Sequence, residues 1–123
     1  MELYQAWLYK AENDFWGAEI LFANALNDLA IYHAQQCAEK SLKGFLKFKE
    51  VDIPKTHNLD KLLDLCKKID AEFDIIDYQV FELNGLDVRY RYPLSVLEPE
   101  VEEVEIAIAQ AETVLNFIKE KCF

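Results

Sequence analysis

The spacing of apolar residues constrains the fold of this chain more than any other feature. Apolar side chains recur every three or four positions, as on one face of a helix, and only three glycines and three prolines interrupt them. No segment alternates with the period of two that a strand requires. We therefore predict a single all-α domain over residues 1–123, an antiparallel up-and-down bundle of four to five helices. The expected helices cover about 2–25, 29–50, 59–69, 74–88 and 99–122.

Turn-forming residues separate these segments. Asn27 and Asp28 are expected to supply a turn and a cap for the second helix. Residues 51–58 form a loop because their proline cannot continue a helix. Thr56 or Asn58 can cap the helix that follows.

The charge of the chain limits its partners. Thirteen basic residues against 23 acidic ones give a net charge of −10, which repels phosphate backbones at long range. Broad, non-specific nucleic-acid binding is therefore not expected, although a local basic site can still hold one phosphate or a short RNA. The beginning MELYQAWLYK lacks a signal-peptide pattern, and no apolar run approaches the length of a membrane span. A cytoplasmic protein is expected.

The sequence also predicts neither a metal nor a cofactor. The chain has three scattered cysteines on apolar helical faces and no CxxC pair, namely Cys37, Cys66 and Cys122. We therefore expect their thiols to be buried and to pack in the core. There is no glycine-rich phosphate loop and no group of ligands at a familiar metal spacing.

The stretch DVRYRYP, residues 87–93, contains both arginines of the chain, and the other eleven basic residues are lysines. Arg89 and Arg91 can make bidentate contacts to phosphate or carboxylate. Tyr90 and Tyr92 add rings on which a base or a guanidinium can stack. This alternation is consistent with capture of a nucleotide or RNA. The alternative is a structural clamp, in which the arginines pair with carboxylates and the tyrosines pack.

A polar stripe on the second expected helix allows two interpretations. It can be a solvated face on which Glu39 pairs with Lys43, or a surface that meets phosphate or an acidic partner. We expect Lys40 to join the arginines in a ligand site, together with Lys55 and His57 from the loop. A histidine in that position can instead pack or bond a nearby carbonyl. The stripe comprises His33, Gln36, Lys40, Lys43 and Lys47.

Large apolar residues outside the helical stripes point to an interface. Trp16 and Ile20 lie one turn apart on the first expected helix, and Ile106 and Phe117 lie on the last. Exposed groups of this kind often mark self-association or a protein partner. In the alternative, a further element of the same chain covers them.

Three segments in order resemble the HEPN domain family, named for "higher eukaryotes and prokaryotes nucleotide-binding". They are HAQQCAEKSLKGFLKFK (33–49), PKTHNLDKLL (54–63) and RYP (91–93), preceded by Trp7, Ala11, Asp14 and Ala18. The resemblance covers nearly the whole chain. It implies a helical bundle of four or five helices that usually dimerises and often pairs with a small nucleotidyltransferase in a toxin–antitoxin-like system.

Active HEPN ribonucleases carry an arginine followed, after four to six residues, by a histidine, and cleave RNA without a metal. Counting from Arg89 or Arg91 leads to LSVLE, residues 94–98, which contains no histidine. Arginine cannot replace the missing base because its pKa stays above roughly 12. We therefore expect a non-catalytic nucleotide- or RNA-binding partner of a nucleotidyltransferase. The alternatives are a metal-independent ribonuclease that uses a histidine from elsewhere and a purely structural module.

Overall fold

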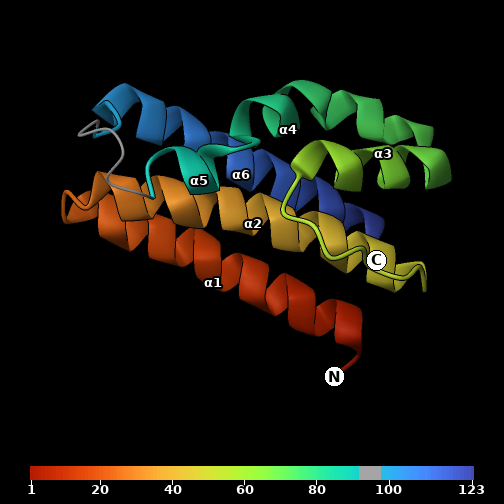
Figure 1. Ribbon diagram of the computed structural model, residues 1–123. Coiled ribbons are helices and arrows are strands. Elements are labelled where there is room, and N and C mark those ends of the chain that lie inside the picture. Colours follow the sequence, from red (N-terminus) through yellow and green to blue (C-terminus); the bar gives the residue numbers. More distant parts are fainter. Residues whose placement is uncertain (92–97) are drawn as a thin grey trace.

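The computed structural model describes residues 1–91 and 98–123, and within them it is all helical with no strand (Figure 1). The predicted all-α bundle is thereby confirmed. Tyr92 and the other residues up to 97 lie outside the described part of the chain. The elements are α1 (Leu3–Ala23), α2 (Asn27–Phe48), α3 (Leu59–Ile69), η1 (a 3₁₀-helix, Ala71–Ile76), α4 (Asp77–Leu83), α5 (Leu86–Arg89) and α6 (Val101–Lys121).

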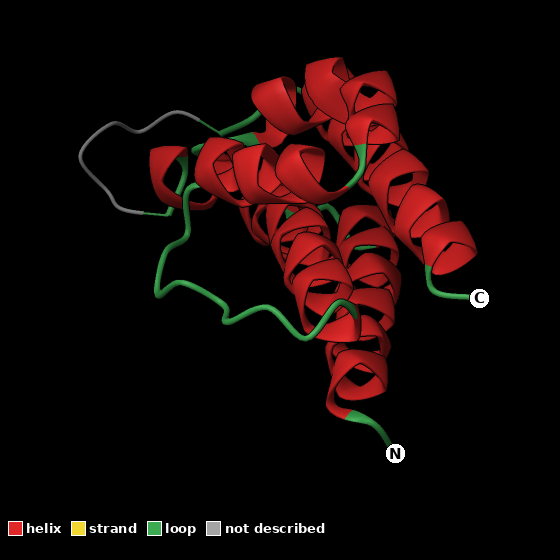
Figure 2. Cartoon of the chain, turned by 90° about the vertical axis from the view of Figure 1, so that its right-hand side faces the viewer, coloured by secondary structure: helices red, strands yellow, loops and turns green. Residues whose placement is uncertain are grey.

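Helix α2 is the centre of the bundle. It packs antiparallel against α1 on one side and contacts α6, α3, α4 and α5 on the others (Figure 1). The long loop between α2 and α3 runs along the outside of the helices before the chain turns into α3 (Figure 2). None of the helices in the described ranges is long and apolar enough to cross a membrane.

The helix expected over 74–88 is divided into three pieces. Gly85 has a φ of 87°, a left-handed conformation that ends α4 before α5 begins. Asn84 fixes the break from the other side, since its Oδ1 accepts a hydrogen bond of 2.9 Å from the backbone N–H of Leu59. The periodicity of this segment indicated its buried face but not the glycine break, which turns α5 onto α2.

The two predicted caps have different outcomes. The side chain of Asn58 accepts hydrogen bonds from the backbone N–H groups of Asp60 and Lys61, at 2.9 and 3.3 Å, so this cap is confirmed. The cap at Asn27 and Asp28 is wrong, because α2 already begins at Asn27 and Leu26 precedes it without a side-chain cap. The chain turns earlier, at residue 25, where φ is 61°.

The core contains a row of aromatic rings that corrects one expected interface residue. Phe73 of η1 lies between Phe45 and Phe117, with ring centroids 4.5 and 5.0 Å away. Phe117 is therefore half-buried against the core and does not project into solvent, because η1 covers it. Here the alternative interpretation, in which a further element of the chain covers an apolar residue, is correct.

The three cysteines are buried, as predicted. Burial raises the pKa of the Cys37 and Cys66 thiols to about 12 and that of Cys122 to about 11, so all three are protonated at neutral pH.

Leu115 tests the packing of α6. Its side chain is only 3% exposed. We expect Leu115→Ala to lower the free energy of unfolding by about 2–5 kcal/mol, measured by urea denaturation, because it removes buried methyl groups and leaves a cavity. A loss below about 0.5 kcal/mol, the usual effect at a surface position, would show that α6 does not pack as described.

Candidate functional site

Helix α2 carries a polar cluster on the side that faces α1. Asp14 of α1 is 7% exposed, and its Oδ1 lies 2.7 Å from Nδ1 of His33. Its Oδ2 accepts a hydrogen bond of 2.6 Å from Nζ of Lys40. Burial raises the pKa of Asp14, but the hydrogen bonds with His33 and Lys40 outweigh burial and hold the pKa below its ordinary value. This cluster ties α1 to α2 through a charged carboxylate.

A second cluster, on the side of α2 that faces the loop, has Glu39 at its centre. Glu39 is 2% exposed, and its Oε2 accepts a hydrogen bond of 3.0 Å from Nζ of Lys43. Nδ1 of His57 lies 3.1 and 3.2 Å from the two carboxylate oxygens, and Nε2 of Gln36 donates to Oε1 at 3.3 Å. His57 thereby holds the loop of residues 51–58 against α2.

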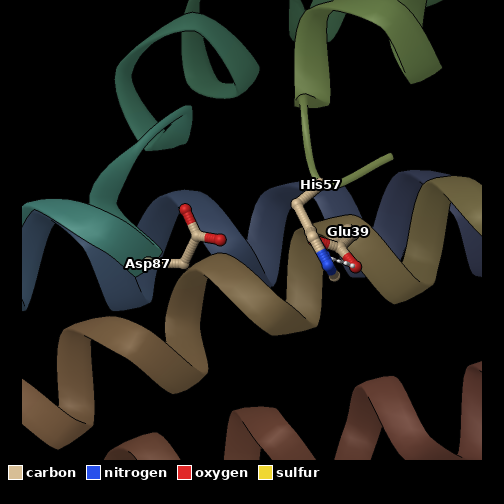
Figure 3. A group of neighbouring side chains, drawn as sticks. All are labelled: Glu39, His57 and Asp87. Carbon is tan, nitrogen blue, oxygen red and sulfur yellow. Dashed lines mark hydrogen bonds and ion pairs between the residues drawn. The ribbon is translucent and has the colours of Figure 1, made fainter. Parts of the chain in front are cut away.

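Asp87 of α5 brings a second buried carboxylate to this cluster (Figure 3). It is 5% exposed, and one ligand atom each from Glu39, His57 and Asp87 lies within 4.8 Å of the others. The pKa of the Asp87 carboxyl is raised, mainly because the group is buried and secondly because Glu39 is negatively charged. Sequence analysis missed this grouping because the three residues come from distant segments with no shared motif.

The polar stripe of α2 is not the solvated face that one interpretation predicted. Gln36 and Lys43 are 8% exposed, so the expected pair of Glu39 with Lys43 exists but lies in the interior. The reason is that α1, the loop and α5 cover the stripe, and a helical wheel of α2 alone cannot show them.

Arg89 and Tyr90 contact α6. The hydroxyl of Tyr90 donates a hydrogen bond of 2.6 Å to Oε1 of Glu103, and Nη1 of Arg89 lies 3.9 Å from Oε2 of the same residue. Burial, followed by this hydrogen bond, raises the pKa of Tyr90. The Arg89 side chain is 64% exposed. It borders a hollow of about 360 Å³ between α4, α5 and α6 that also contains Glu82.

Arg91 contacts the first half of α2 instead. Its guanidinium carbon lies 5.3 Å from the ring centroid of Tyr32. The Tyr32 ring packs edge-on against the imidazole of His33, with the two ring centroids 5.1 Å apart. Arg91 is exposed. A cation over an aromatic face is an attractive arrangement that also orients the guanidinium.

The described contacts of the predicted ligand residues thus lie on different elements. Arg89 and Tyr90 meet α6, Arg91 meets Tyr32, and Lys55 is exposed on the loop. Lys40 and His57, by contrast, bond the buried carboxylates of Asp14 and Glu39. Sequence reasoning missed Tyr32, which faces Arg91.

Three residues expected at an interface are exposed. Trp16 is 57% exposed, Ile20 63% and Ile106 53%. Trp16 and Ile20 lie on α1, and Trp16 borders a hollow next to Leu115 and Lys119 of α6.

Comparison with known proteins identifies the family of the chain and its fold. The model of the HEPN domain matches residues 4–121. The chain belongs to the HEPN domain family. The HAQQCAEK segment of this HEPN chain, residues 33–40, supplies His33, Gln36, Glu39 and Lys40 to the two clusters described above.

Two solved structures resemble the whole domain. The structure of TT1696 from Thermus thermophilus has a TM-score of 0.84 and 27% identity, covering 98% of this chain and 99% of that one. The archaeal HEPN homologue ST0689 has a TM-score of 0.76 and 25% identity, with both chains covered completely. Among curated proteins, no significant match exists.

Asp14 provides a test of the first cluster. We expect Asp14→Asn to lower the free energy of unfolding at neutral pH by about 1–3 kcal/mol, since it weakens two hydrogen bonds to charged or polar partners. Because the pKa of Asp14 is lowered by folding, its contribution is complete above the ordinary pKa of 3.8 and is lost as the pH falls through the lowered value.

Urea denaturation of both proteins between pH 7 and pH 2 measures this difference. If the difference in unfolding free energy between the wild type and Asp14→Asn stayed constant down to pH 2, Asp14 would not be charged in the folded protein.

Proposed function

We propose that this HEPN chain binds a nucleotide or a short RNA through the exposed arginines after α5, without cleaving it. The observation that carries this proposal is the position of the Arg91 guanidinium over the Tyr32 ring, 5.3 Å from its centroid. A guanidinium carries its N–H groups in a fork geometry that suits phosphate oxygens. The ring also orients the side chain, which reduces the entropy lost when a ligand binds.

The low basic content of the chain favours a small ligand. At a net charge of −10 the molecule repels long polyanions, whereas one or two phosphates need only a local site. Arg89, exposed at the end of α5 two residues earlier, supplies a second guanidinium. Its loose contact with Glu103 at 3.9 Å is weak enough for a phosphate to replace.

The arrangement of the histidines supports binding rather than catalysis. The Nδ1 atoms of His33 and His57 both contact a buried carboxylate. Arg89 contacts Glu103 and the Tyr90 ring, and one contact of Arg91 is with the Tyr32 ring. One observation favours the ribonuclease alternative: the His57 side chain is 76% exposed while Glu39 orients it, as in a general base positioned by a carboxylate.

Binding is tested by fluorescence anisotropy with a labelled RNA of about six nucleotides and by competition with ATP. We expect Arg91→Ala to weaken binding about tenfold, or roughly 1.4 kcal/mol, because it removes a charged hydrogen-bond donor. Lys68→Ala, at an exposed position on α3, removes the same charge and is expected to bind like the wild type.

Equal affinities of wild type and Arg91→Ala would contradict the proposal. In the same samples without metal the RNA should stay intact. Cleavage that disappears in His57→Ala would establish the ribonuclease alternative instead.

We further propose that the chain forms a homodimer and partners a small nucleotidyltransferase, as the family resemblance implies, with Trp16 and Ile20 at an interface. Both are large, apolar and exposed on α1, a composition typical of interface anchors.

Light scattering coupled to size exclusion tests this interface. Trp16→Ala should shift the mass of the protein toward that of the monomer at low micromolar concentration. Phe81→Ala removes another aromatic residue, 68% exposed on α4, and should leave the mass unchanged. An identical mass for wild type and Trp16→Ala would refute the proposed dimer interface.

A further inference from the structure

We propose that Glu39, His57 and Asp87 bind a divalent cation, with Zn²⁺ preferred over Mn²⁺ and Mg²⁺. One imidazole nitrogen and two carboxylate oxygens are a donor set that first-row transition metals accept. Each residue comes from a different part of the chain: α2, the loop and α5 (Figure 3).

The two clusters on α2 differ by one carboxylate. The cluster at Asp14 has one carboxylate, one lysine and one imidazole. The cluster at Glu39 has the same three groups, with Lys43 and His57, and Asp87 in addition. Its two carboxylates therefore exceed its one lysine, and the cluster attracts a further cation.

Asp87 gives the second, independent indication of a ligand. It is 95% buried, and the backbone N–H groups of Asp87 and Val88 donate hydrogen bonds to its carboxylate, but none of the ion pairs among the described residues includes it. Figure 3 shows its carboxylate directed toward the space beside His57 and Glu39. A buried carboxylate without a cationic partner is costly unless a proton or a metal ion neutralises it.

The distances suit a small ion after a modest adjustment. The three ligand atoms lie within 4.8 Å of one another. Zinc bonds of about 2.0–2.2 Å bring ligand atoms to roughly 3.4 Å apart in a tetrahedral site. His57 lies on a loop with 76% of its side chain exposed, so its imidazole can make this movement. The same exposure provides an entry path and room for a water ligand.

Lys43 does not block the site, because the two oxygens of Glu39 have different partners. Oε2 accepts the hydrogen bond from Lys43 at 3.0 Å, whereas Oε1 has only the longer contact of 3.3 Å with Gln36 besides His57. A cation bound by Oε1 and by Nδ1 of His57 would replace the proton that these two atoms share. It would join the loop, α2 and α5, the helix that leads into Arg91.

Isothermal titration calorimetry on untagged, chelator-treated protein tests this site with ZnCl₂, MnCl₂ and MgCl₂. We expect one Zn²⁺ per chain and weaker binding of Mn²⁺ and Mg²⁺. His57→Ala and Asp87→Asn should each weaken Zn²⁺ binding at least about tenfold, since each removes a ligand. His33→Ala is the matched control: it removes the imidazole of the other cluster and should leave Zn²⁺ affinity unchanged.

Three results would overturn the proposal: no Zn²⁺ binding by the wild type, wild-type affinity in Asp87→Asn, or equal losses in His33→Ala and His57→Ala. Circular dichroism confirms that each variant is folded, and Asp87→Asn should remain so because it removes a buried charge. A rise in the melting temperature with Zn²⁺ in the wild type, absent in Asp87→Asn, gives a second readout. Neither measurement contains RNA, so the outcome is independent of the proposed nucleotide binding.

Discussion

The fold depends on two buried carboxylates, Asp14 and Glu39, that lie against the central helix. Each takes a lysine and a histidine as partners, and each joins α2 to a neighbour: Asp14 lies on α1, and Glu39 meets the loop through His57. Burying a charge is unfavourable unless its partners have good geometry, so these contacts specify how the elements assemble.

The sequence predicted the helical class, the order of the long helices and the Asn58 cap, because apolar periodicity and capping chemistry are local properties. It did not predict the break at Gly85 or the covering of Phe117 by η1, which depend on contacts between distant segments. The polar stripe of α2 was misinterpreted as a solvated face for the same reason. Glu39, His57 and Asp87 have no common spacing, so their grouping has no signal in the sequence.

The predicted basic site residues have two kinds of surroundings. Lys40 and His57 contact the buried carboxylates of Asp14 and Glu39, whereas Arg89 and Arg91 are exposed at the end of α5 and beyond it. Helix α5 connects the two, because Asp87 faces the interior cluster and Arg89 follows two residues later.

Asp14 and Lys40 stabilise the fold as a charged pair between α1 and α2. A double-mutant cycle with Asp14→Asn and Lys40→Met, measured as free energies of unfolding at pH 7, tests it most directly. We expect a coupling energy of about 0.5–3 kcal/mol, the range for residues in direct contact. Additive losses, with no coupling between the two positions, would contradict it.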